Sequence, residues 1–332
     1  MAAEIYIISG FLGAGKTTFI QKLLKEAFQK DKVVLIENDF GEISVDAALL
    51  KADGVEVQEI NSGCICCSLS GDFVKALKEL LDRFHPDKII IEPSGVGKLS
   101  DIMKACSDPR IQPLAEVRAK ITVADVKRCK MYLDNFGEFF EDQIQNADAI
   151  LLSRVEDFPA RVNDAYKLIK SLNAHSVIFA KPWKQIGADE ILFPRRDYHE
   201  HEEHCGHVHG GECRQQGIHE HKDHTDCDHD HSAEGIFDTV TIRTNRKFTA
   251  EDLKACIYKF EHNQYGTVLR AKGIVRGIHG YVNLQYLPGD LKITNCFTGG
   301  NMLCIIGRNL NKQELIRLFS GEGDSCIYPS TL

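Results

Sequence analysis

The strongest constraint on the fold is an octapeptide near the N-terminus, residues 10–17, which reads GFLGAGKT. An apolar, strand-like run at residues 4–9 precedes it, and an amphipathic stretch at residues 17–30 follows it. The pattern G-x-x-x-x-G-K-[ST], placed between a strand and a helix, is typical of a loop that encloses phosphate groups. The alternative is a Gly-rich turn with an incidental lysine, but such a turn would not need to lie between a strand and a helix. We therefore predict an α/β domain that binds a nucleotide at this loop.

Each residue type in the loop has a physical role in binding phosphate. The glycines let the backbone curl around the anion, and the N–H groups at the helix start point toward it. Lys16 neutralises charge on the β- and γ-phosphates, and the Thr17 hydroxyl is a ligand for Mg²⁺. The predicted nucleotide-binding residues of the loop are Gly10, Gly13, Ala14, Gly15, Lys16, Thr17 and Thr18.

The first half of the chain alternates apolar runs with amphipathic stretches. Apolar residues recur at helical spacing in residues 17–30 and 72–84. Strands that alternate with helices predict a mostly parallel sheet with helices on both faces, an α/β fold of the P-loop NTPase type. The predicted strands are residues 4–9, 32–38, 55–60, 88–94, 119–125, 147–153 and 176–180.

Composition divides the chain into three segments. Residues 1–183 are the predicted nucleotide domain, and residues 236–332 are a smaller α+β domain. Residues 184–235 are the predicted linker, because positions 199–231 hold ten of the fourteen histidines and three cysteines but few apolar residues. Such a composition cannot form a core. His-rich tracts are typical of weak, interchangeable metal sites, and a purely hydrophilic spacer is the alternative.

The C-terminal segment carries its own secondary-structure signals. Residues 237–244 alternate like a half-buried strand, and two or three more strands are predicted within 267–307. Thr249 and Asp252 form a capping-box pattern before one helix, and Asn311 opens a final helix.

A second acidic element is expected near the phosphate loop. Glu92 ends the apolar run KIIIE, where a carboxylate can act on a nucleotide-bound metal ion, and Gly95 follows it near the γ-phosphate. A solvated strand end is the alternative interpretation of Glu92. We predict Lys16, Thr17 and Glu92 as the catalytic residues. Residues 37–42, ENDFGE, follow the second strand and form a candidate loop that senses phosphate or metal.

Residues 63–69, GCICCSL, contain three cysteines within four positions. On a loop between a strand and a helix, Cys64, Cys66 and Cys67 can present three thiolates to one metal ion and leave one Zn²⁺ coordination position open. A redox pair and inert burial are the alternatives, although Cys66 and Cys67 would form a strained vicinal disulfide and Cys64 and Cys66 lack the Cys-x-x-Cys spacing. We favour the metal site. The cysteines scattered among apolar positions are predicted to be core residues: Cys106, Cys129, Cys256, Cys296, Cys304 and Cys326.

Charge and apolar patterning argue against several classes of partner. The net charge of −8 is concentrated in residues 199–231, which contribute −7, so no basic field indicates nucleic acid. No apolar run approaches the roughly 18 residues of a membrane span, and no signal-peptide pattern opens the chain. The expected location is cytoplasmic, where twelve cysteines favour metal or redox roles over disulfides.

Four motifs in this order, GFLGAGKTT, IENDFGE, GCICC and IEPSG, resemble those of the CobW-like GTPases. These proteins belong to the SIMIBI class of P-loop GTPases and are related to the maturation factors of hydrogenase, urease and nitrile hydratase. The resemblance covers residues 4–180 and extends more weakly to LRAKGIV at residues 269–275. Many members of the family also carry a His-rich linker.

The resemblance implies a GTP-hydrolysing metallochaperone, or metal insertase. GTP or GDP and Mg²⁺ would bind at the phosphate loop. A transition metal, either Zn²⁺ or alternatively Co²⁺ or Fe²⁺, would bind at Cys64, Cys66 and Cys67, with Glu37 and Glu42 assisting. Nucleotide hydrolysis would release the metal to a client protein, and neither a nucleic acid nor a membrane is an expected partner.

One segment departs from the family pattern. The guanine-binding motif Asn-Lys-x-Asp should follow ADAILL, but the chain reads Ser153-Arg154-Val155-Glu156. Glu156 can accept hydrogen bonds from guanine N1 and N2, and Arg154 can stack on the base. Ser153 is short for the role of Asn. We predict Ser153, Arg154 and Glu156 as the guanine contacts.

Two other functions stay open from the sequence. A zinc-buffering protein would store metal in the linker and use the nucleotide site for regulation. A P-loop kinase would transfer phosphate to a small substrate, but it leaves GCICC and the linker without a role.

Overall fold

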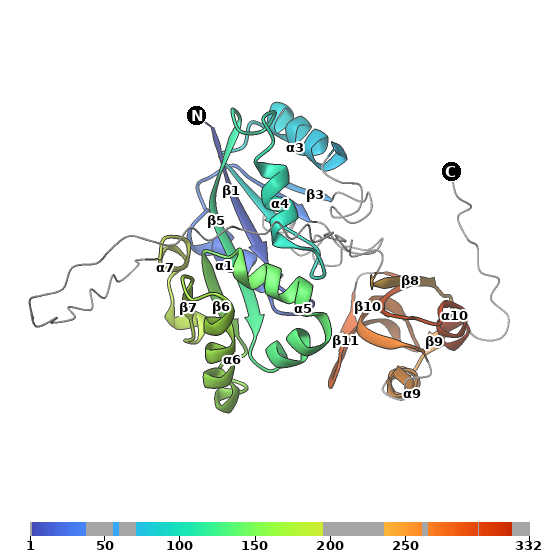
Figure 1. Cartoon of the computed structure of the whole chain (residues 1–332). Helices are drawn as coiled ribbons and strands as arrows, with labels where there is room; N and C mark the ends of the chain where they lie inside the picture. The colour runs from blue at the N-terminus through green and yellow to red at the C-terminus, as the bar shows by residue number, and fades with distance from the viewer. Residues whose placement is uncertain are drawn as a thin grey trace, which may run out of the picture.

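The computed structural model describes residues 2–37, 56–59, 71–194, 236–260, 265–297 and 299–320. Its first sheet has the strand order β3-β2-β4-β1-β5-β6-β7, and all of its neighbouring strands pair in parallel. This confirms the predicted α/β class (Figure 1). The strands are β1 (Ala3–Ser9), β2 (Val33–Glu37), β3 (Glu56–Glu59), β4 (Lys88–Glu92), β5 (Ala115–Asp125), β6 (Ala149–Ser153) and β7 (Val177–Phe179).

Helices cover both faces of this sheet because its strands are apolar on both sides. In β1, Ile5 and Ile7 face one core, whereas Tyr6 and Ile8 face the other, as the two-residue period of a strand requires. Four helices pack on the first face: α3 (Gly71–Phe84), α4 (Leu99–Cys106), α5 (Cys129–Gln145) and α6 (Pro159–Leu172). Two pack on the second: α1 (Lys16–Glu26) and α7 (Ala188–Leu192).

The packing of the nucleotide domain continues past residue 183, the predicted end of this domain. A short 3₁₀ helix, η1 (Trp183–Gln185), leads into α7, and Ile186, Ile191 and Leu192 are buried against α1. The apolar residues of this segment recur at helical spacing. Its core therefore includes residues that the sequence analysis assigned to the linker.

The C-terminal segment forms a second sheet of order β12-β11-β10-β13-β8, with β9 paired to β10. The two helices pack on one face of this sheet. The elements are β8 (Asp238–Arg243), β9 (Lys247–Phe248), α9 (Ala250–Phe260), β10 (Thr267–Gly277), β11 (Gly280–Leu287), β12 (Asp290–Cys296), β13 (Met302–Arg308) and α10 (Lys312–Ser320).

Two details of this domain were predicted with different success. The capping box before α9 is confirmed: the Thr249 N–H donates to Asp252 Oδ2 at 2.8 Å, and the Asp252 N–H donates to Thr249 Oγ1 at 2.9 Å. The predicted count of two or three strands within 267–307 was wrong, because β10, β11, β12 and β13 all lie there. Connections of only two residues join β10 to β11 and β11 to β12, and the second contains Gly289 at φ 69°. In the sequence, such short turns are hard to tell from a continuous alternation of apolar and polar residues.

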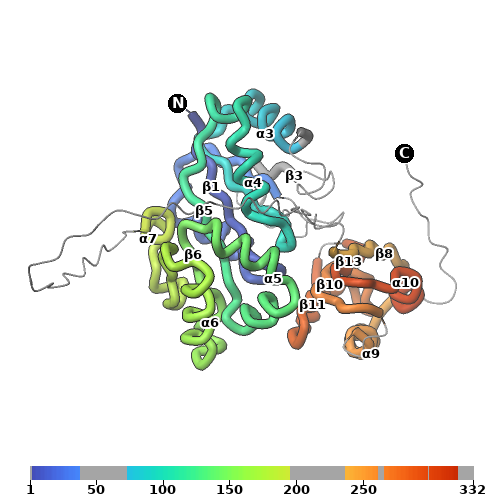
Figure 2. The backbone as a smooth tube through the Cα atoms, viewed as in Figure 1, coloured from blue at the N-terminus to red at the C-terminus, as the bar shows by residue number. Residues whose placement is uncertain are grey.

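The second domain packs against α5 of the first. Phe237 lies in the same core as Phe136 and Phe139, with ring centroids 5.3 and 5.1 Å away. Leu269, in β10, belongs to this core as well. Figure 2 shows the second domain beside α5 and the carboxyl end of the first sheet. Among the described residues, no helix has the length and apolarity needed to cross a membrane.

Candidate functional site

The phosphate loop joins β1 to α1 through backbone conformations that favour glycine. Gly10 has φ 137° and Gly15, the residue before α1, has φ 108°. A Cβ at Gly10 would lie 2.3 Å from the Val123 carbonyl oxygen, closer than any real Cβ contact. The chain can therefore make this turn against β5 only with glycine at position 10.

A buried tyrosine of α5 holds the loop in place. The Tyr132 hydroxyl donates a hydrogen bond of 2.9 Å to the Leu12 carbonyl, and its ring packs on Phe11 with centroids 4.2 Å apart. Burial raises the pKa of Tyr132 far above its ordinary value, so the hydroxyl stays protonated and acts as a donor. The loop is thus fixed by the helix packed behind it.

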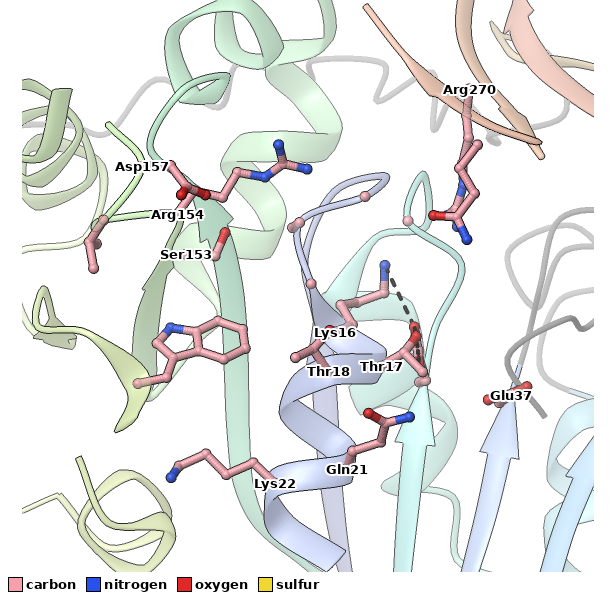
Figure 3. Close-up of a pocket in the computed structure, with 18 of the residues that line it drawn as sticks. Lys16, Thr17, Thr18, Gln21, Lys22, Glu37, Ser153, Arg154, Asp157 and Arg270 are labelled. Atoms are coloured by element: carbon pink, nitrogen blue, oxygen red, sulfur yellow. Dashed lines mark hydrogen bonds and ion pairs between the residues drawn. The ribbon is translucent and has the colours of Figure 1, made fainter. Parts of the chain in front are cut away.

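The three predicted catalytic residues lie together at the carboxyl ends of β1 and β4. Thr17 Oγ1 lies 3.4 and 3.5 Å from the two Glu92 carboxylate oxygens. Lys16 Nζ lies 3.9 Å from Glu92 Oε1 and donates a hydrogen bond of 3.0 Å to the Gly10 carbonyl. Figure 3 shows Lys16 and Thr17 of this cluster close together where α1 begins. Hydroxyl and carboxylate oxygens are the hard ligands that Mg²⁺ prefers, so the donor set fits this ion.

These residues line a cavity of about 760 Å³, within the range of small-molecule sites. Its wall combines three groups: the phosphate loop and α1, the ends of β2, β4 and β6, and residues of the second domain. The residues that sequence reasoning did not assign to a site are Gln21, Lys22, Lys25, Glu26, Pro93, Ser94, Val155, Asp157, Trp183, Lys184, Arg270, Gln285 and Lys292.

The predicted guanine-binding residues lie at one end of this cavity. Ser153 is buried at the end of β6, and Glu156 is exposed beyond it. Arg154 has φ 59°, and its guanidinium lies 3.3 Å from Asp125 Oδ2 and 2.7 Å from Asp290 Oδ2. The structure brings Ser153, Arg154 and Glu156 to one cavity, and their contact with guanine stays a prediction.

Asp290 connects the two domains through two arginines. Besides Arg154, it lies 3.6 Å from Arg128, whose guanidinium is held by Asp125 at 2.5 Å. Burial raises the pKa of Asp290. The hydrogen bond and charge of Arg154 lower this pKa by more than burial raises it, so it lies below the usual 3.8. Because Arg154 also lines the cavity, this bridge joins the predicted base site to the second domain.

A second interdomain approach occurs at Glu37, the last residue of β2. Glu37 is 6% exposed and lines the cavity, and Lys272 of β10 is 4% exposed. Burial lowers the pKa of Lys272 to about 8, while the negative charge of Glu37 raises it in part. The second domain therefore places a buried amine within electrostatic reach of the strand end that precedes the predicted sensing loop.

The remaining predicted metal ligands, Cys64, Cys66, Cys67 and Glu42, lie outside the described residues, as does the His-rich segment. Within the described ranges, no group of three His, Cys, Asp or Glu side chains is placed to hold a metal ion. Cys106, Cys129, Cys256 and Cys304 are buried, which confirms their predicted core positions, and Cys296 is half-buried.

Trp183, the one tryptophan of the chain, is a cavity residue that the sequence analysis used only to mark a boundary. Its indole N–H donates to the Leu152 carbonyl at 2.7 Å, and a Cβ at Gly15 would lie 3.2 Å from its ring. A large aromatic residue shortly after the last strand of the sheet was the available signal. No motif in the sequence indicated Gln285 or Lys292, which lie in the second domain.

Residues 4–180 match the nucleotide-binding domain shared by CobW, HypB and UreG, and residues 237–321 match the C-terminal domain of the cobalamin synthesis protein CobW. The chain belongs to the CobW/HypB/UreG family. This confirms the resemblance found in the four sequence motifs, and the fold is that of a P-loop GTPase with the family's second domain.

Curated relatives of this family member are named for zinc. The zinc chaperone CobW of Sinorhizobium sp is 30% identical over 243 residues, which cover 61% of this chain and 68% of that protein. The zinc chaperone YeiR of Escherichia coli is 34% identical over 148 residues, 45% of each chain. The zinc-regulated GTPase metalloprotein activator 1 of Saccharomyces cerevisiae is 25% identical over 215 residues, 57% of this chain and 50% of that protein.

Two solved structures match this chain at low identity. The Zn(II)-bound YjiA GTPase of E. coli is 16% identical, covers 96% of this chain and 98% of its own, and gives a TM-score of 0.41. The hydrogenase maturation factor HypB of Archaeoglobus fulgidus is 18% identical over 57% of this chain and 87% of its own, with a TM-score of 0.43.

Proposed function

We propose that this chain is a GTP-hydrolysing metallochaperone that carries zinc and transfers it to a client protein. The observation that carries the proposal is that Lys16, Thr17 and Glu37 line one cavity. The phosphate loop and the strand that leads into the predicted sensing loop therefore share a site. The names of the family relatives, zinc chaperone and zinc-regulated GTPase, support zinc as the cargo.

In this proposal the nucleotide spans the cavity from the phosphate loop to the end of β6. Gly10, Gly13, Ala14, Gly15, Lys16, Thr17 and Thr18 hold the phosphates, and Ser153, Arg154 and Glu156 contact the guanine. Thr17 and Glu92 would hold Mg²⁺, directly or through water, and the ion would neutralise charge on the phosphate oxygens. Catalysis then rests on positioning and electrostatics, with Lys16 neutralising the charge that develops on the phosphates.

The proposed cargo site lies beside the phosphate site. Strands β2 and β3 are neighbours, and Glu37 is in register with Glu59, the last residue of β3. Cys64 follows Glu59 after only four intervening residues, and the chain returns to the described structure at α3, so connectivity supports a position near Glu37. Cys64, Cys66 and Cys67, with Glu37 and Glu42, would bind Zn²⁺, and Co²⁺ or Fe²⁺ are the alternative cargoes.

The test measures zinc affinity in each nucleotide state. Full-length protein is titrated with Zn²⁺ against a chromophoric chelator in the presence of GTP analogue or GDP, and phosphate release from GTP is followed separately. We expect one tight zinc equivalent whose affinity differs between the two nucleotide states. The Cys66→Ser/Cys67→Ser protein should lose this equivalent and keep GTP binding, whereas Lys16→Ala should lose GTP binding.

Cys296→Ser is the matched control, because Cys296 is half-buried in β12, outside the proposed metal site. Equal zinc affinity in both nucleotide states would refute the coupling. Loss of nearly all bound zinc on deletion of residues 199–231 would favour the storage function instead. The cytoplasmic location and the client protein stay predictions.

A further inference from the structure

One face of the second domain's sheet forms part of the cavity wall. Lys272 pairs with Gln285 across β10 and β11, and Gln285 pairs with Lys292 across β11 and β12. Directly opposed residues of neighbouring strands share a face, so these three side chains form one row. Gln285 and Lys292 line the cavity, and Arg270, two residues before Lys272, lines it as well. The second domain therefore contributes cations to the site that holds the phosphate loop.

A β-bulge turns Arg270 toward this face. Val268, Ala271 and Val275 all pack in the core beneath α9 and α10. In an uninterrupted strand Val268 and Arg270 would share a face. The register of β10 with β13 shifts between Val268 and Arg270, however, and the extra residue places Arg270 on the opposite face, together with Lys272. Bulges often redirect side chains beside functional sites.

Arg270 lies at the phosphate end of the cavity. Figure 3 shows it reaching from the second domain toward Lys16 and Thr17, away from Ser153 and Arg154. Burial raises the pKa of Tyr132, and the Arg270 guanidinium is one of the cations that oppose this rise. Arg270 therefore lies within electrostatic reach of Tyr132, the residue that holds the phosphate loop through Leu12.

The hydrogen-bonding state of Arg270 separates it from the other arginines at this interface. Arg128 and Arg154 are both engaged by Asp125 and Asp290. In the described part of the chain, the half-buried Arg270 guanidinium makes no hydrogen bond or ion pair with another residue. A guanidinium offers five N–H donors in a planar fork, a geometry that matches phosphate oxygens.

We propose that Arg270 binds the γ-phosphate of GTP, so that the second domain supplies a cation to GTP hydrolysis within the same chain. The inference rests on the proposed function. In the reaction a water oxygen bonds to the γ-phosphorus, and the bond from that phosphorus to the β–γ bridging oxygen breaks. GDP, inorganic phosphate and a proton result. Arg270 keeps its proton throughout and stabilises the negative charge that builds up on the transferred group.

This role ties the position of the second domain to the nucleotide state. The attraction between Arg270 and the γ-phosphate exists with GTP and disappears once phosphate leaves. The second domain is therefore held more firmly before hydrolysis than after it. A ligand that favours one arrangement in this way shifts the equilibrium by its differential affinity.

The test compares Arg270→Ala, Arg270→Lys and unaltered full-length protein in three measurements. These are the affinity for a non-hydrolysable GTP analogue, the affinity for GDP, and kcat for GTP. We expect Arg270→Ala to weaken analogue binding roughly 10- to 100-fold, the loss of a charge-assisted hydrogen bond, with GDP affinity unchanged. We expect kcat to fall roughly 100- to 1,000-fold. Arg270→Lys keeps the charge without the fork and should lie between the two.

Arg276→Ala is the matched control, because Arg276 is an exposed arginine of the same strand that does not line the cavity. The inference is overturned if Arg270→Ala keeps both affinities and kcat, if it weakens GDP as much as the analogue, or if Arg276→Ala has the same effects. Thermal unfolding with GDP present shows that each variant is folded, and Arg270→Gln replaces Arg270→Ala if it is not. Failure of the unaltered chain to bind GTP would instead refute the proposed function.

Discussion

Replacing Asp290 with alanine tests whether the ionic bridge between the two domains contributes to stability. Asp290 Oδ2 lies 2.7 Å from Arg154 and 3.6 Å from Arg128. Both Asp290 and Arg154 are 22% exposed, so solvent screens their attraction only in part. The substitution removes the carboxylate from the second domain while Asp125 remains beside both arginines.

The expected effect follows from these distances. Two unit charges 2.7 Å apart attract by about 6 kcal/mol at an effective dielectric constant of about 20. Desolvation of the pair offsets much of this attraction, and Asp125 leaves neither arginine as an uncompensated buried charge. We therefore expect Asp290→Ala to lower the free energy of unfolding by about 1–3 kcal/mol.

A double-mutant cycle isolates the pair. Urea unfolding of the unaltered chain, Asp290→Ala, Arg154→Ala and the double variant is followed by circular dichroism and by the fluorescence of Trp183. We expect a coupling free energy of about 1 kcal/mol or more between the two positions. Asp134→Ala, which removes the exposed partner of Lys130, is the control and should leave stability unchanged. A coupling below about 0.3 kcal/mol would show that the bridge does not stabilise the domain contact.

Three further outcomes are expected. The pKa of Asp290 in the folded chain lies below 3.8, so its carboxylate should stabilise the fold fully above pH 4 and lose this effect as the pH falls through that folded-state pKa. The difference in free energy of unfolding between the unaltered chain and Asp290→Ala should therefore shrink in acid titrations. Tyr132→Phe removes the donor to the Leu12 carbonyl and should lower the free energy of unfolding in urea by about 1–3 kcal/mol; an unchanged midpoint would contradict this. Gly10→Ala places a Cβ against the Val123 carbonyl at a φ of 137° and should lower stability by about 2 kcal/mol or more, and a thermal midpoint equal to that of the unaltered chain would show that the loop tolerates the side chain.

Local features of this protein could be predicted from sequence because neighbouring residues in the chain create them. The strand, glycine turn and helix of residues 4–26 follow from consecutive residues, and the capping box of Thr249 and Asp252 spans one helical turn. Glu92 could be placed beside Thr17 because the carboxyl ends of parallel strands meet at one edge of the sheet.

Features that depend on turn length and register were predicted less well. The strands of the second domain were undercounted because two-residue connections leave little trace in an alternating pattern. The bulge between Val268 and Arg270 is likewise invisible in the sequence, yet it decides which way Arg270 faces. Arg154 fits a base-stacking role by position, and only the folded structure shows its guanidinium between Asp125 and Asp290.

The sequence by itself determined the phosphate loop, the parallel sheet and the family of this protein. The loop and the family follow from short, ordered motifs, and the sheet follows from apolar runs that alternate with amphipathic stretches. Tertiary structure decided what surrounds that loop: Arg270, Gln285 and Lys292 enter the cavity from a separate domain, and Asp290 binds an arginine beside the predicted base site. The physical reason is that such contacts depend on how two independently patterned cores pack together, and no local pattern specifies that packing.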